Sequence, residues 1–268
     1  MNTNGIEKKR RCLFICDESW KAEEVELINV AIIEVKMLSK MPEILKKLSF
    51  CDSLIHLRRV RNGRVIVGPE EEFKEQIDLI IRSYNEYVEV QTIPVPKTAA
   101  ITRRQYEFSQ RYWGVKFTEN RVLERKLNGT FFTSAQFELI CQTISLARSE
   151  DGCVITNSEF KELGKASGSQ MSALEPLKHP FMRALDNLVH ERRKATKRSA
   201  QGEQYLATDC YAFVHNEPCA MCAMAMVHGR VRSVFFADPS TNGAFVTNCQ
   251  LHLKPNLNHH YDVFHLTN

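Results

Sequence analysis

The most informative segment of this 268-residue chain is Asn216-Glu217-Pro218-Cys219-Ala220-Met221-Cys222-Ala223-Met224-Ala225. Cys219 and Cys222 lie three residues apart and therefore share one face of a helix, and Pro218 suits the start of that helix. The helix dipole and the unpaired N–H groups at a helix start favour thiolates, the form of cysteine that binds zinc. Two buried structural cysteines or a redox-active dithiol would also fit this spacing.

A histidine further towards the N-terminus is a candidate third ligand. It opens the segment His179-Pro180-Phe181-Met182-Arg183-Ala184-Leu185, in which Pro180 suits the first turn of a helix with a buried apolar stripe. A lone histidine at such a place is usually a core residue. Together with Cys219 and Cys222, however, His179 completes three protein ligands with a fourth position free, the arrangement of catalytic zinc sites. The sequence therefore predicts that His179, Cys219 and Cys222 bind Zn²⁺. Water is the default fourth ligand, and an alternative is a fold-back of the C-terminal histidines His259, His260 and His265.

These two segments resemble the signature of the zinc nucleobase deaminases, His-x-Glu followed by Pro-Cys-x-x-Cys. The chain departs from it at one position, where Phe181 replaces the glutamate that transfers protons between the bound water and the base. Phenylalanine has no titratable group, so general acid–base catalysis from this position is impossible. We therefore predict no catalytic residue in this chain, although the zinc ligands remain.

A narrower resemblance is to the non-catalytic subunit of the eukaryotic heterodimeric tRNA-specific adenosine deaminase, in which an apolar residue also replaces the glutamate. It covers the chain from about Pro94 onwards. Besides residues 217–228, it is carried by Val95-Pro96-Lys97-Thr98-Ala99, Thr102-Arg103-Arg104-Gln105-Tyr106 and Leu257-Asn258-His259-His260-Tyr261-Asp262-Val263-Phe264.

This resemblance implies a cytidine-deaminase-like α/β fold, a three-layer α/β/α domain preceded by a small α+β domain. It also implies a heterodimer with a catalytic subunit, which converts the wobble adenosine of tRNA anticodons to inosine in the cytoplasm and nucleus. The present chain would then position tRNA and support its partner.

Pro94-Val95-Pro96 favours extended backbone and suggests a domain boundary. We expect an α+β tRNA-binding module over residues 1–95, a connector over 96–130 and the zinc domain over 131–268. Within the module, patterning predicts a strand at 13–16, helices at 23–35 and 70–84, and a hairpin of 53–60 with 64–67 around Asn62-Gly63. A further helix should begin at Ser134 as its N-cap. The polar residues 164–172 are expected to be mobile.

The positive charge is concentrated in the N-terminal half. Of the 36 Lys and Arg and the 32 Asp and Glu, 23 and 19 respectively precede residue 131, which accounts for the whole net charge of +4. Such clusters are either solvated surface or contacts to phosphate groups. A second basic run covers residues 192–198. The candidate tRNA contacts are Arg58, Arg59, Arg61, Arg64, Arg103 and Arg104.

Two rival functions stay open. An active nucleoside or cytosine deaminase would need another base, but the nearby carboxylates of Glu175 and Asp186 do not have the required spacing from His179. A zinc-containing RNA-binding scaffold differs mainly in lacking an obligate deaminase partner. For such a partner, the helix after Cys219 offers Met221, Met224 and Met226, about half of which should fill the core.

The chain shows no apolar run of membrane-spanning length. The apolar residues 12–16 end at Asp17 and Glu18, too soon for a signal peptide. We therefore expect an intracellular protein without membrane contact, whose 9 cysteines are thiols or metal ligands.

Overall fold

The computed structural model describes residues 10–168, 175–196 and 206–267. The chain forms two compact units, Glu18–Glu124 and the combination of Met1–Asp17 with Arg125–Asn268. They are called the N-terminal unit and the C-terminal unit below, after the residues that make up most of each.

The C-terminal unit is built on a six-stranded mixed sheet in the order β1-β10-β9-β8-β6-β7. The three central strands β10, β9 and β8 are parallel, and the remaining pairs are antiparallel. The strands are β1 (Arg11–Ile15), β6 (Cys153–Thr156), β7 (Glu162–Ala166), β8 (Tyr211–Asn216), β9 (Ser233–Asp238) and β10 (Asp262–Thr267).

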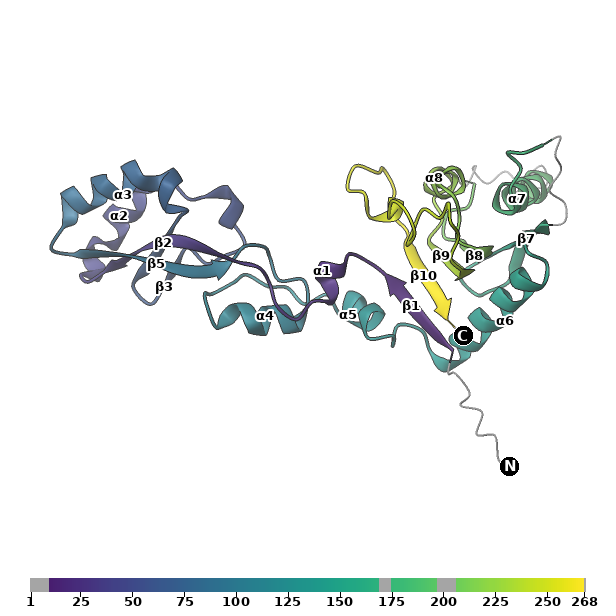
Figure 1. Ribbon diagram of the computed structural model, residues 1–268, viewed down its shortest axis with the longest axis horizontal. Helices are drawn as coiled ribbons and strands as arrows, with labels where there is room; N and C mark the ends of the chain where they lie inside the picture. The colour runs from purple at the N-terminus through teal and green to yellow at the C-terminus, as the bar shows by residue number, and fades with distance from the viewer. Residues whose placement is uncertain (1–9, 169–174, 197–205, 268) are drawn as a thin grey trace, which may run out of the picture. The chain divides into compact units, whose positions relative to one another are not determined.

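Helices cover both faces of this sheet (Figure 1). Helix α6 (Ser134–Ser149) packs on one face, and α7 (Pro180–Thr196) and α8 (Ala220–Gly229) pack on the other. Alternation along β8 explains the layering, because Phe213 contacts the α6 side while Ala212 and Val214 contact the α7 and α8 side. This is the expected three-layer α/β/α fold. A 3-10 turn (Leu251–Leu253) precedes β10.

The N-terminal unit contains an antiparallel sheet in the order β3-β4-β2-β5. Helices α2 (Met41–Lys47) and α3 (Glu70–Tyr84) pack on one face, and Trp113, Val115 and Leu57 pack on the other. The strands are β2 (Leu27–Val35), β3 (Val60–Arg61), β4 (Arg64–Gly68) and β5 (Val88–Pro96). The shorter elements are α1 (Glu18–Lys21), 3-10 turns at Leu38–Lys40 and Asp52–Leu54, α4 (Arg103–Gln110) and α5 (Arg121–Leu127), which runs across the unit boundary.

The structure divides the chain differently from the expected 1–95, 96–130 and 131–268. Strand β1 belongs to the C-terminal unit because its backbone groups pair with β10. Most of the expected connector belongs to the N-terminal unit, since Trp113 and Val115 complete a core there. Pro94 and Pro96 do not end the unit. They lie on the edge strand β5, where a missing N–H costs no ladder hydrogen bond.

The predicted helix at 23–35 is wrong, because residues Leu27–Val35 form strand β2. Ala31 and Ile33 pack against one core, and Val30 and Ile32 pack against the other. A strand buried on both faces is continuously apolar and rich in β-branched residues, which obscures the two-residue alternation.

Other local predictions are confirmed with small shifts. Helix α3 covers 70–84 as expected, and the first strand runs over Arg11–Ile15. Asn62 and Gly63 form the hairpin turn with φ of 49° and 78°, but β3 has only two residues. Helix α6 has Thr133 as its N-cap instead of Ser134. Of the polar stretch 164–172, residues 164–166 belong to β7 and 169–172 lie outside the described residues.

Within the described part of the chain, no helix combines the length and apolar character that crossing a membrane requires. None of the nine cysteines, all of which are described, forms a disulfide.

Candidate metal centre

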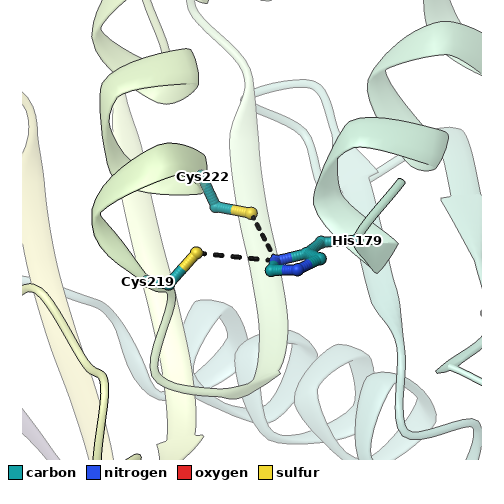
Figure 2. Close-up of side chains that lie close together, drawn as sticks. All are labelled: His179, Cys219 and Cys222. Atoms are coloured by element: carbon teal, nitrogen blue, oxygen red, sulfur yellow. Dashed lines mark hydrogen bonds between the residues drawn. The ribbon is translucent and has the colours of Figure 1, made fainter. Parts of the chain in front are cut away.

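Two helix starts bring the three predicted ligands together (Figure 2). Cys219 is the N-cap of α8 and Cys222 lies in its first turn, directly after the carboxyl end of β8. His179 immediately precedes α7, whose first residue is Pro180. Both helices lie on the same face of the sheet, so the spacing seen in the sequence becomes a single cluster.

The geometry of this cluster fits a zinc ion. His179 Nδ1 lies 3.5 Å from the Sγ atoms of both Cys219 and Cys222. Tetrahedral zinc with Zn–S of about 2.3 Å and Zn–N of about 2.0 Å places nitrogen and sulfur ligands roughly 3.5 Å apart. Across residues 10–168, 175–196 and 206–267, these three residues make the only such group of potential ligands, with ligand atoms within 4.8 Å of one another.

Burial opposes the thiolate that the sequence analysis expected at this helix start. Burial, assisted by the neighbouring Cys219, raises the pKa of the Cys222 thiol above its ordinary value. A cation at the site would reverse this preference, because thiolate ligands bind metal with release of their protons. The helix start alone does not keep this cysteine deprotonated.

No carboxylate stands in for the missing glutamate at the positions that the sequence analysis considered. Phe181 is 2% exposed and belongs to the same core cluster as Cys222 and Ala223. Glu175 forms ion pairs with Lys178 and Arg183, at 2.7 and 3.2 Å. Asp186 is exposed on α7. The site therefore has ligands for a metal and an apolar side chain where proton transfer requires an acid.

The C-terminal histidines do not close the metal site. His259 Nε2 lies 2.7 Å from the Val231 carbonyl, and His265 Nε2 lies 2.9 Å from the Ala237 carbonyl. His260 Nδ1 contacts the His252 carbonyl at 3.4 Å. Each is held by backbone oxygens elsewhere in the unit, so the alternative of a histidine as fourth ligand is wrong for the described arrangement.

Glu217 is a site residue that the sequence analysis missed. It is 3% exposed, and its carboxylate accepts hydrogen bonds from the backbone N–H groups of Phe245 and Val246 at 2.7 and 2.6 Å. Burial alone would raise the pKa of Glu217, but hydrogen bonds from Thr247, Val246 and Phe245 outweigh burial and lower it. An acidic residue directly before Pro218-Cys219, where the chain passes from strand β8 to helix α8, was the available signal.

Two other segments that carry the resemblance have structural roles. Thr102 and Gln105 form a capping box at the start of α4, and the buried Gln105 amide donates to the Ser19 and Ala22 carbonyls at 2.7 and 3.1 Å. In the C-terminal segment, the Tyr261 hydroxyl donates to the Ala223 carbonyl on α8 at 3.0 Å. These hydrogen bonds hold α4 and α8 against neighbouring parts of the chain.

The predicted arginine cluster does not project as one exposed group. Arg59 donates to the Leu45 and Leu48 carbonyls and lies over the Phe50 ring, and Arg61 donates to the Gln110 carbonyl at 3.3 Å. Of the four hairpin arginines, only Arg58 and Arg64 are exposed. Three of the six predicted contacts form ion pairs with carboxylates, namely Arg64 with Glu34, Arg103 with Glu107 and Arg104 with Glu23.

Comparison with known families agrees with this site. Residues 138–238, which include all three ligands, match the cytidine and deoxycytidylate deaminase zinc-binding region. The chain is similar in sequence to proteins that carry the names inactive tRNA-specific adenosine deaminase-like protein 3 and Tad3. "Probable inactive tRNA-specific adenosine deaminase-like protein 3" of Danio rerio is 27% identical over 201 residues, which cover 64% of this chain and 60% of that protein. The Homo sapiens protein of the same name is 27% identical over 213 residues with the same coverage.

A fungal relative matches over more of the chain. "tRNA-specific adenosine deaminase subunit tad3" of Schizosaccharomyces pombe is 26% identical over 269 residues, which cover 89% of this chain and 83% of that protein. By contrast, the match to the vertebrate relatives spans only 60% of their length. A solved structure from a study of A-to-I editing by tRNA:A34 deaminases aligns with 48% of this chain and 95% of that chain, at 18% identity and a TM-score of 0.37.

Proposed function

We propose that this chain is the non-catalytic subunit of a heterodimeric tRNA adenosine deaminase that converts wobble adenosine to inosine, with the active site in the partner subunit. The observation that carries the proposal is the pairing of a three-ligand metal shell with buried Phe181 at the acid–base position. Such a site retains the metal-binding part of a deaminase and lacks its proton transfer. The names of the vertebrate and fungal relatives support the same role.

Zinc held by His179, Cys219 and Cys222 would act as a cross-link between the starts of α7 and α8. Its binding energy would then contribute to the stability of the C-terminal unit. Phe181 contributes apolar packing beneath the ligands.

The partner surface on α8 uses the methionines that the core of the unit leaves partly covered, in line with the expectation that about half of them fill the core. Met226 and Val227 are buried within the unit, whereas Met221 and Met224 are only partly covered. We assign the subunit contact to the latter two, because partly covered methionines adapt readily to a second apolar surface.

We assign tRNA binding to a cationic corner of the N-terminal unit, defined by Arg58, Arg61, Arg111 and Lys116. Leu57 and Val115 are paired in an antiparallel bridge, and both are buried. Because side chains alternate along a strand, Arg58 and Lys116 then point outwards on one face. Arg61 and Arg111 flank this face, since Arg61 bonds to the Gln110 carbonyl next to Arg111.

Among the described residues, no carboxylate pairs with any of these four cations, of which Arg58 and Arg61 belong to the predicted set. The ion pairs that the structure describes in this unit use other cations, including Arg64, Arg103 and Arg104. Guanidinium and ammonium groups without a carboxylate partner are available for phosphate, which supplies affinity without sequence information.

As part of the proposed role in tRNA modification, the chain would be located in the cytoplasm and nucleus.

Reconstitution tests the proposed function. The purified chain should show no conversion of adenosine to inosine in any tRNA, and it should restore conversion when added to a catalytic deaminase subunit that carries an intact His-x-Glu. Deamination by the chain alone, or an active complex that gains nothing from it, would overturn the proposal. A stable complex with tRNA but with no deaminase would favour the RNA-binding scaffold instead.

A further inference from the structure

The loop over residues 240–248 closes around the buried Glu217 carboxylate. The carboxylate accepts from the backbone N–H groups of Ser240, Phe245, Val246 and Thr247, at 3.3, 2.7, 2.6 and 3.2 Å, and from the Thr247 hydroxyl at 2.6 Å. Five donors directed at one carboxylate form an anion-binding cradle of the kind that backbone N–H groups build around phosphate. Here the anion comes from the chain itself.

The same loop pairs with the metal-binding turn. Gly243 forms an antiparallel bridge with Cys219, and the Ala244 N–H donates to the Pro218 carbonyl at 2.9 Å. The Glu217 N–H donates to the Asp238 carbonyl at 2.7 Å, which ties the turn to the end of β9. Cys219, the N-cap of α8, is therefore held between the strand ends and a loop that Glu217 organises.

Packing leaves no room between this loop and the carboxylate. A Cβ atom at Gly243 would lie 2.1 Å from both Cδ and Oε2 of Glu217. Since real Cβ contacts are essentially never below 3.0 Å, any side chain at Gly243 would displace either the carboxylate or the loop backbone that pairs with Cys219. The glycine and the glutamate thus act as one unit.

We propose that Glu217 is a positioning residue for the metal site, which sets the place of the Cys219 Sγ through the 240–248 loop and Gly243. This inference rests on the proposed metal site. A residue that only stabilised the 240–248 loop would not need to lie two residues before a predicted metal ligand, with its carboxylate buried among five hydrogen-bond donors. Residues that orient metal ligands typically change metal affinity about 10-fold to 100-fold when they are altered.

Zinc affinity of the full chain, measured by competition with a chromophoric chelator, tests the proposal. Glu217→Gln places an amide NH₂ among N–H donors and should weaken zinc binding by about ten-fold. Thr247→Val removes a single hydrogen bond and should weaken it two- to three-fold, which provides a milder variant if Glu217→Gln folds poorly. Glu159→Gln, at an exposed carboxylate in the same unit, is the matched control and should bind zinc normally.

A double-mutant cycle separates positioning from general stabilisation. Gly243→Ala should weaken zinc binding by about ten-fold in the unmodified chain, yet by less than two-fold in the Glu217→Ala background, where the clashing carboxylate is gone. With Co²⁺ at the site, Glu217→Gln should also shift the thiolate-to-cobalt charge-transfer bands. A residue that only stabilised the fold would lower the melting temperature and leave those bands in place.

Three results would overturn the inference alone: normal zinc affinity in folded Glu217→Gln and Thr247→Val chains, independent effects in the cycle, or an unchanged cobalt spectrum. Absence of zinc binding by the unmodified chain would overturn the proposed metal site, and this inference with it.

Discussion

The turn before α8 and the hairpin around Asn62-Gly63 both attract attention in the sequence, one for its cysteines and the other for its arginines. In the structure, Cys219 and Cys222 meet His179 as their spacing predicts. The arginines separate: Arg59 folds against backbone carbonyls, Arg64 pairs with Glu34, and Arg58 stays exposed. Ligand positions at helix starts follow from local geometry, whereas the fate of a long charged side chain depends on which acceptors the fold brings nearby.

The largest effect should come from removing a ligand at the turn. We expect the unmodified chain to bind about one zinc ion and Cys222→Ser to bind less than half an equivalent, because a shell of two protein ligands loses most of its affinity. Elemental analysis of chelator-free protein measures this. Cys249→Ser, at another partly buried cysteine of the same unit, is the control and should retain the metal. Equal zinc content in both variants would remove the turn from the metal site.

The next largest effect is the pH dependence of folding stability that the buried His252 causes. Burial lowers the pKa of His252 from its ordinary value to about 4, against the opposing hydrogen bond to the Ile15 carbonyl. Between pH 6.5 and 4 the unfolded chain takes up a proton there that the folded chain refuses, so stability falls as the pH falls, by up to about 3 kcal/mol. Above pH 6.5 this contribution is fully present.

Urea unfolding at pH 7, 5.5 and 4.5 measures this dependence. His252→Leu should flatten it, even if that variant is less stable at pH 7. His228→Gln, at an exposed histidine on α8, should leave it unchanged. The same pH slope in His252→Leu as in the unmodified chain would show that another group is responsible.

A smaller effect is expected at the hairpin. Arg58→Gln combined with Lys116→Gln should weaken tRNA binding by about ten-fold and lower the log–log salt slope by roughly 1.5, since two phosphate contacts are lost. The matched control is Arg64→Gln with Arg103→Gln, which removes two cations that carboxylates already neutralise. Its tRNA affinity should stay within two-fold of normal. The reverse ranking of the two double variants would place the tRNA contact on the paired arginines and not at the cationic corner.

The smallest effect should come from Phe181, although it occupies the position of a catalytic group. Phe181→Leu keeps an apolar side chain in the core, so it should cost about 1 kcal/mol of stability. Deamination by the assembled complex should remain within a few-fold of normal. Activity assays at matched complex concentration measure this, with zinc content as a check on folding. A hundred-fold loss in an intact complex would mean that Phe181 contributes directly to the reaction.

Much of the fold could be predicted where local pattern and burial agree. Helix α3 repeats apolar residues on one face only, and it forms over the expected residues. The apolar spacing predicted a helix in place of strand β2 because cores on both sides make every residue from Val30 to Ile33 apolar. Burial on two faces is a property of the assembled unit, and a single segment does not reveal it.

The sequence by itself determined the candidate metal ligands and the absence of an acid–base group at Phe181, because both depend on residue identity at fixed spacing. Only the tertiary structure decided which arginines remain without a carboxylate, that β1 joins β10 at the far end of the chain, and that Glu217 lies in a cradle of N–H donors. The physical reason is the large sequence separation between the residues that make these contacts. Residues 217 and 245–247 are about thirty positions apart and meet only in the folded unit, so their hydrogen bonds leave no periodic trace in the sequence.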